Sequence, residues 1–174
     1  VLTVNACDAI RFGAVGKHAA RFLCAKGAVL VAASDSAGTL HDPAGINVDE
    51  LTRLKAAGKS VTDFPRGNKL GRDDVIGVEC EIWIPAARPD VVHEGNAGRL
   101  RTKLVPQGAN IPFTAGAEKI LHERGVLVLP DFIANAGGVI CAAMEYRGAT
   151  QTTALQAIEE KIRANTAAVL AESK

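Results

Sequence analysis

Short apolar runs alternate with segments of helical periodicity along this chain, and this alternation constrains the fold more than any other feature. Residues 28–33 form an unbroken apolar run, which is typical of a strand buried on both faces of a parallel sheet. The preceding residues 13–26 repeat apolar side chains at the spacing of one helix face, and Gly27 follows as the residue that ends the helix. A helix that leads directly into such a strand belongs to a βαβ unit, which predicts an α/β fold.

The rest of the chain continues in the same order. We expect further strands at residues 1–6, 80–85, 103–106 and 126–129, and further helices at residues 48–57, 114–124, 135–146 and 155–170. Asn47 and Thr114 stand where helix N-caps are needed. Residues 34–45 are predicted to be a loop, and residues 59–77 to have little regular structure. Because no repeat or low-complexity linker interrupts this order, residues 1–174 are predicted to form a single domain with a doubly wound, mostly parallel sheet.

The composition excludes several classes of function. Twenty basic and nineteen acidic residues give a net charge of +1 without a long run of either sign, so neither nucleic acid nor an anionic membrane is expected as a partner. The apolar runs are too short to span a bilayer, and no secretory or transit signal is recognised at the start. The four cysteines are widely spaced among apolar neighbours, which predicts buried thiols in a reducing compartment and hence a cytoplasmic protein. The four histidines have no metal-ligand spacing.

The turn Arg11-Phe12-Gly13-Ala14-Val15-Gly16 is the first candidate for a ligand site. A glycine-containing turn between a strand and a helix can hold a dinucleotide, since the helix N-terminus presents free N–H groups to the pyrophosphate. Gly13 would allow the close backbone approach, and Gly16 the tight packing of helix on strand. The usual pattern begins with a third glycine, where this chain has Arg11, and Asp8 places a carboxylate in the preceding segment. The alternative is a helix start whose glycines serve only packing, in a domain that no longer binds nucleotide.

Asp35 and Ser36 form a second candidate, at the end of the apolar strand. Asp35 follows Gly13 by 22 residues, close to the offset of about 20 at which an acidic residue bonds the adenosine ribose hydroxyls. A carboxylate there disfavours the 2′-phosphate of NADP, so NAD is the expected cofactor. NADP stays an alternative, because Ser34 and Ser36 could bond a phosphate if a basic side chain approached.

Several blocks of the sequence together resemble one known family. They are Ala33-Ser-Asp-Ser-Ala-Gly-Thr39, Ile84-Pro-Ala-Ala87, Gln107-Gly-Ala-Asn110 with Pro112 and Thr114, and Pro130-Asp-Phe-Ile-Ala-Asn-Ala-Gly-Gly-Val139. In this order and spacing they resemble the glutamate/leucine/phenylalanine/valine dehydrogenases, and most of all a glutamate dehydrogenase. The blocks cover essentially the whole chain. The resemblance implies a Rossmann-like domain that binds NAD or NADP for an amino-acid dehydrogenase.

The resemblance also implies roles for single residues. Ala86 and Ala87 are small residues after a strand, where the adenosine half and the pyrophosphate of the cofactor can lie close to the backbone. Asn110 resembles a ligand of the nicotinamide ribose or ring, and Asn135 resembles the residue that orients the nicotinamide amide or the amino-acid end of the substrate. The two glycines after Asn135 would keep side chains out of the cleft. The candidate cofactor-binding residues are therefore Gly13, Ala14, Val15, Gly16, Asp35, Ser36, Ala86, Ala87, Asn110 and Asn135.

Two positions depart from the family pattern. Gln107 stands where the family commonly has glutamate. Ala142 stands where glutamate-specific members carry a serine that binds the side-chain carboxylate of the substrate. Because alanine cannot donate that hydrogen bond, the sequence leans toward an apolar amino acid as substrate.

The implied reaction is the reversible oxidative deamination of an L-amino acid to a 2-oxo acid and ammonia. A hydride moves from the α-carbon to the nicotinamide, and a lysine and a carboxylate handle the proton and water steps. In the family both groups stand in an N-terminal catalytic domain, and neither of their motifs occurs here. We therefore assign no catalytic residue, and we expect the chain alone to be inactive, the catalytic domain of the same enzyme to be its partner, and the full enzyme to be a homo-oligomer. The alternative is a stand-alone, non-catalytic dinucleotide-binding or sensor module.

Overall fold

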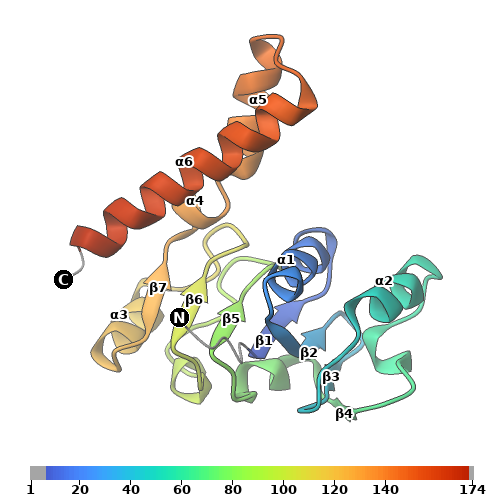
Figure 1. Ribbon diagram of the computed structural model, residues 1–174. Helices are drawn as coiled ribbons and strands as arrows, with labels where there is room; N and C mark the ends of the chain where they lie inside the picture. Colours follow the sequence, from blue (N-terminus) through green and yellow to red (C-terminus); the bar gives the residue numbers. More distant parts are fainter. Residues whose placement is uncertain (1–6, 173–174) are drawn as a thin grey trace.

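A seven-stranded sheet forms the centre of the protein, in the order β4-β3-β2-β1-β5-β6-β7 (Figure 1). The computed structural model describes residues 7–172, and for residues 7–11 it describes the backbone alone. The strands are β1 (Cys7–Arg11), β2 (Val29–Ser34), β3 (Thr39–His41), β4 (Asn68–Leu70), β5 (Ile82–Ile84), β6 (Leu104–Pro106) and β7 (Leu127–Leu129). Strands β2, β1, β5, β6 and β7 pair in parallel, whereas β3 and β4 pair antiparallel at one edge. The predicted mostly parallel α/β sheet is confirmed.

Helices connect the strands where the apolar periodicity placed them. They are α1 (Ala14–Ala25), α2 (Val48–Ala56), α3 (Ala115–Glu123), α4 (Asp131–Ala134), α5 (Gly137–Tyr146) and α6 (Gln151–Glu172), with 3-10 turns η1 (Val61–Asp63), η2 (Arg72–Gly77) and η3 (Ala97–Arg99). The side chain of Asn47 accepts from the N–H groups of the second and third residues of α2 at 3.0 Å, and that of Thr114 accepts from the N–H of the third residue of α3 at 3.2 Å. Gly27 takes a φ of 95°, the left-handed conformation that follows a helix end and that glycine adopts without strain.

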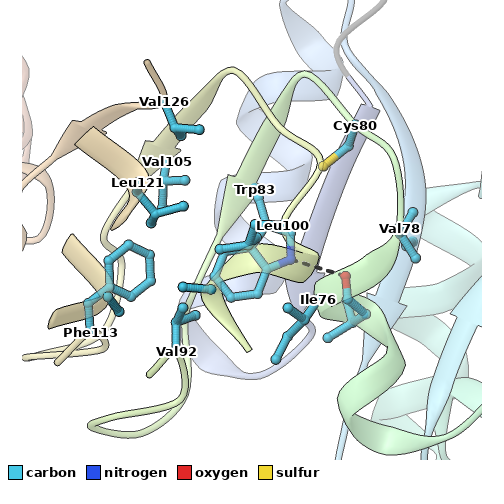
Figure 2. Close-up of a cluster of buried hydrophobic side chains, with 14 of the residues drawn as sticks. Ile76, Val78, Cys80, Trp83, Val92, Leu100, Val105, Phe113, Leu121 and Val126 are labelled. Carbon is cyan, nitrogen blue, oxygen red and sulfur yellow. Dashed lines mark hydrogen bonds between the residues drawn. The ribbon is translucent and has the colours of Figure 1, made fainter. Parts of the chain in front are cut away.

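Hydrophobic side chains pack on both faces of the sheet. On one face, α1, α2 and η1 pack with β2 and β3 around Leu30 and Leu51. On the other face, η2, η3 and α3 pack with β5 and β6 around Trp83 (Figure 2). The indole N–H of Trp83 donates to the carbonyl oxygen of Val75 at 3.2 Å, and its ring stacks with Phe113 at 6.4 Å between centroids. Because β2 has a core on each face, its sequence is apolar from Val29 to Ala33 instead of alternating.

The C-terminal helices α5 and α6 form an arm; α5 and the start of α6 lie away from the sheet, and the other end of α6 returns toward β7 (Figure 1). There Thr166, Val169 and Leu170 line a hollow together with residues of β6 and β7. The two helices pack against each other, and α6 also contacts α4. Among the described residues of α5 and α6, Ala154 alone is buried. Phe132, Val139, Tyr146 and Leu155 are exposed along α4 and the arm. These side chains have no cover within the described residues of the chain.

Some sequence expectations need correction. The first strand was expected at residues 1–6, which lie outside the described part of the chain, and β1 occupies Cys7–Arg11 instead. The expected loop at residues 34–45 contains β3, and residues 59–77 contain β4 with η1 and η2. All three residues of β4 are exposed, so the strand has no apolar signal.

The predicted burial of the cysteines is only partly right. Cys80 is buried, but Cys24 and Cys141 are half-buried, and the side chain of Cys7 lies outside the description. Within residues 7–172, no helix is long and apolar enough to cross a membrane. Within the same residues, no group of three or more His, Cys, Asp or Glu side chains could hold a metal ion.

Candidate functional site

The order of the strands creates a crevice at one edge of the sheet. The chain passes from β1 to β2 on one side and later places β5, β6 and β7 on the other side of β1. The direction of winding therefore switches between β1 and β5, and doubly wound sheets bind ligands at this point, outside the carboxyl ends of the strands. A cleft of about 650 Å³ opens here. It is lined by Val15 after β1, Ala86 and Ala87 after β5, Asn110 after β6, and Asn135 after β7.

The turn after β1 leaves the N-terminus of α1 open. Gly13 is the N-cap of α1, and a Cβ at Gly13 would meet no atom within 4 Å. Its missing side chain therefore serves no packing contact, but it keeps space free in front of the helix N–H groups. Ala14 and Val15 are exposed, whereas Gly16, in the first turn of α1, is buried. The side chains of Asp8 and Arg11 lie outside the described part of the protein.

Two asparagines meet across the cleft. The amide Nδ2 of Asn135 donates to Oδ1 of Asn110 at 2.7 Å, although the residues lie 25 positions apart. This bond uses one oxygen and one N–H, so the pair still offers the amide N–H groups of Asn110 and the amide oxygen of Asn135 to a ligand. Gly137 and Gly138 line the cleft next to them and add no side chain.

Gln107 and Asp131 hold the loop that carries Asn110. Gln107 is 2% exposed, and its side-chain oxygen accepts from the backbone N–H of Asp131 at 3.0 Å while its Nε2 donates to Glu118 at 3.1 Å. The carboxylate of Asp131 in turn accepts from the N–H of Ile111 at 2.7 Å. An amide suits this place because it needs one acceptor and one donor, and a glutamate here would face the carboxylate of Glu118. This explains the departure of Gln107 from the family pattern.

Asp35 lies at the end of β2 with its carboxylate turned to internal donors. Oδ1 accepts from the Ala37 N–H at 2.9 Å and from the Ser60 hydroxyl at 3.0 Å. Oδ2 accepts from Nζ of Lys55 at 2.6 Å and from the Val61 N–H at 2.9 Å. Burial alone would raise the pKa of Asp35, but the bonds from Lys55, Val61, Ala37 and Ser60 outweigh it and lower the pKa to about 2. All four acceptor positions of the carboxylate are thus taken within the chain.

A second, smaller hollow adjoins the cleft. It shares Ala86 and Ala87 with the cleft and extends from them to Asp35 and to the side chains of Arg72 and Arg88. Its free space measures only about 30 Å³, so the hollow is too small to enclose a nucleotide.

The structure brings five of the predicted residues together in the cleft, which are Val15, Ala86, Ala87, Asn110 and Asn135. Gly13, Ala14 and Gly16 form the adjoining start of α1, Asp35 lines the smaller hollow, and Ser36 is exposed on the turn after β2. The ribose-binding role of Asp35 stays a prediction, and its four internal bonds count against it.

The sequence interpretation missed the residues that surround Asp35. Lys55 and Ser60 lie 20 and 25 positions beyond it, and no local pattern connects them. Arg72 lies in a stretch of sequence without clear periodicity. Arg88 follows directly after Ala87. Asp131 could have been recognised, because it is the second residue of the block Pro130–Val139 that resembles the family.

Comparison with known proteins gives consistent matches over nearly the whole chain. A family model described as Glutamate/Leucine/Phenylalanine/Valine dehydrogenase matches residues 10–173. The chain is 41% identical over 165 residues to a glutamate dehydrogenase of Aeropyrum pernix, a match that covers 91% of this chain and 40% of that protein. It is 38% identical over 135 residues to an NADP-specific glutamate dehydrogenase of Saccharolobus shibatae, covering 78% of this chain and 32% of that protein. The chain thus spans at most about two-fifths of the length of these relatives.

Solved structures show the same fold. The hetero-hexameric glutamate dehydrogenase of Thermus thermophilus in its leucine-bound form matches with a TM-score of 0.81 and 25% identity, over 93% of this chain and 40% of that one. The glutamate dehydrogenase of Peptoniphilus asaccharolyticus matches with a TM-score of 0.74 and 26% identity, over 95% of this chain and 40% of that one.

Proposed function

Because the chain belongs to the glutamate/leucine/phenylalanine/valine dehydrogenase family, as its sequence blocks predicted, we propose that it is the cofactor-binding domain of an amino-acid dehydrogenase. In this proposal it binds NAD or NADP and supplies one wall of the site in which an L-amino acid is oxidatively deaminated. The observation that carries the proposal is the cleft at the switch point of the sheet. This cleft gathers small residues and the two asparagines from the ends of four strands.

The residues present fit a dinucleotide along the cleft. The pyrophosphate would lie before the open N-terminus of α1, where Gly13 leaves space and no side-chain cap satisfies the first N–H groups of the helix. Ala86 and Ala87 would let the backbone of the loop after β5 approach the cofactor closely. When bound, such a cofactor would supply the hydride-accepting nicotinamide for the oxidation of the substrate.

The asparagine pair has the chemistry to orient the nicotinamide. A primary carboxamide carries one acceptor oxygen and one donor NH₂ group. The N–H groups of Asn110 and the amide oxygen of Asn135 are complementary to these two groups. Fixing the carboxamide fixes the face of the ring, so the pair would act by positioning and not by proton transfer.

The proton steps and the rest of the substrate site are assigned to another part of the enzyme. The chain lacks the lysine motif of the family, and its exposed apolar arm of α5 and α6 offers a surface on which a catalytic domain could pack. Ala142 lies exposed on α5, and its side chain offers no hydrogen bond to a substrate carboxylate. We therefore propose an amino acid as substrate, with an apolar side chain favoured over glutamate, and a full enzyme that is an oligomer.

Titration of the 174-residue chain with NADH and with NADPH by calorimetry tests the proposal. We expect saturable binding of at least one of them and no reduction of either oxidised cofactor by amino acids. Asn110→Ala should weaken binding about fivefold by removing one hydrogen bond, whereas Asn165→Ala on exposed α6 should change nothing. Absence of heat from both cofactors at millimolar concentration would refute the proposal.

A further inference from the structure

We propose that Arg72 and Arg88 bind a phosphate on the 2′-oxygen of the adenosine ribose, so that this chain prefers NADP(H) to NAD(H). The inference rests on the proposed function, because it concerns the adenosine end of the same cofactor site. It reverses the preference for NAD that Asp35 indicated in the sequence.

The inference begins with Asp35, whose carboxylate is not available to bond the adenosine ribose. An acidic residue after the second strand selects NAD by bonding the 2′-hydroxyl and repelling a 2′-phosphate. Asp35 accepts four bonds from Lys55, Ser60, Val61 and Ala37, which fill its acceptor positions. Its charge is also paired with Lys55 at 2.6 Å. It therefore has neither the oxygen to bond a ribose hydroxyl nor the net charge to exclude a phosphate.

The second step is the position of the two arginines. Both line the hollow that also contains Ser34 and Asp35, at the carboxyl end of β2. They reach it from different parts of the chain, Arg72 from the start of η2 and Arg88 from the loop directly after Ala87. An arginine near the end of the second strand is the group that accommodates the 2′-phosphate in dinucleotide-binding domains.

The third step is that an anionic oxygen already lies between the two cations. Oδ1 of Asp73 is 3.7 Å from Nε of Arg72 and 3.9 Å from Nη2 of Arg88. All three side chains are substantially exposed, Arg72 at 42%, Arg88 at 51% and Asp73 at 63%. The arrangement shows that both guanidinium groups can converge on one anionic atom at the mouth of the hollow.

A phosphate should displace Asp73 from this position. Exposed ion pairs of this length contribute little to stability, so the contacts with Asp73 are weak competitors. A phosphate monoester brings up to two negative charges and three acceptor oxygens, and arginine bonds such groups bidentately. The local charge favours it as well, because Arg72 and Arg88 outnumber Asp73 once Lys55 has neutralised Asp35. The exposed hydroxyl of Ser36, on the turn after β2, could supply a further donor.

Parallel binding measurements on the 174-residue chain test the inference. Calorimetry with NADPH and NADH, and with 2′,5′-ADP and 5′-ADP as fragments, isolates the contribution of the 2′-phosphate. We expect NADPH to bind at least about tenfold more tightly than NADH, and the preference to shrink as salt rises. Arg72→Gln and Arg88→Gln should each remove about tenfold of NADPH affinity and leave NADH affinity unchanged.

Two further variants sharpen the test. Asp73→Asn removes the competing carboxylate and should strengthen NADPH and 2′,5′-ADP binding alone. Arg101→Gln is the matched control, because Arg101 is exposed at the opposite end of the sheet beside Glu79. It should leave the ratio of the two affinities unchanged.

The outcomes separate this inference from the proposed function. Equal or tighter binding of NADH overturns the 2′-phosphate site and leaves the cofactor-binding role intact. Equal weakening of both cofactors by the arginine variants also overturns it, because the arginines would then not distinguish the 2′-position. If neither cofactor binds, the proposed function fails and this inference fails with it.

Discussion

Replacing Lys55 by methionine tests the internal role that the structure gives to Asp35. Lys55 makes the one charged contact with this carboxylate among the described residues, at 2.6 Å, and the remaining three donors are neutral. Methionine keeps most of the side-chain volume but neither donates nor carries charge. The variant therefore leaves a carboxylate that is 10% exposed without its cation.

The magnitude follows from the pKa of Asp35 and from exposure. Lowering the pKa from 3.8 to about 2 corresponds to about 2 kcal/mol of stabilisation at neutral pH, from all four bonds less the opposing effect of burial. Breaking a fully buried pair costs about 3–5 kcal/mol, but water screens part of this one because the Lys55 side chain is 29% exposed. We expect Lys55→Met to lower the free energy of unfolding by about 2 kcal/mol at pH 7.

Urea unfolding followed by circular dichroism measures the effect, and its pH dependence identifies the cause. The lowered pKa of Asp35 means that its stabilising contribution is present above about pH 4 and is lost as the pH falls through about 2. Below that range Asp35 is protonated and no longer needs a cation. The difference between Lys55→Met and wild type should therefore close between about pH 4 and pH 2.

Lys59→Met is the matched control, because Lys59 is an exposed lysine that, like Lys55, lies in the segment between β3 and β4. It should change the free energy of unfolding by less than about 0.5 kcal/mol. If Lys55→Met behaves like this control, or if its deficit persists unchanged at pH 2, the reasoning about Asp35 is wrong.

Three other substitutions probe the site and its supports. Gly13→Ala should leave the free energy of unfolding within about 0.5 kcal/mol of wild type, since a Cβ there meets nothing. It should weaken dinucleotide binding about tenfold by narrowing the approach to α1, and an unchanged calorimetric affinity would contradict a role of Gly13 in binding. Gly38→Ala should lower the unfolding free energy by about 1–3 kcal/mol, because its Cβ would lie 2.9 Å from the carbonyl oxygen of Leu70, and a thermal melt without a shift would contradict this. Gln107→Glu should lower the free energy of unfolding by about 2 kcal/mol, because the new carboxylate would face that of Glu118. The pKa of the introduced carboxyl should be raised, so the loss should grow as pH rises above about 4 and be small below it; urea midpoints at pH 4 and pH 8 that shift equally would exclude this cause.

The main architecture could be read from the sequence because its signals are local. Strand β2 is a continuous apolar run, and α1 carries an apolar stripe that ends at Gly27. Helices α2 and α3 begin at side chains that cap their own first turn. Edge strand β4 could not be found in this way, because all of its side chains are exposed and its pairing with β3 joins residues about 30 positions apart.

The sequence by itself determined the family, the doubly wound sheet and the residues of the cleft that follow each strand. Small residues and asparagines at strand ends are visible locally, and the parallel sheet brings those ends to one edge. Only the tertiary structure showed which groups pair with Asp35. Its partners Lys55 and Ser60 lie 20 and 25 positions further along the chain, and packing brings them within hydrogen-bonding distance of its carboxylate. The placement of Arg72 and Arg88 at one hollow was likewise invisible in the chain, because distance in space between charged side chains is set by packing and not by spacing in sequence.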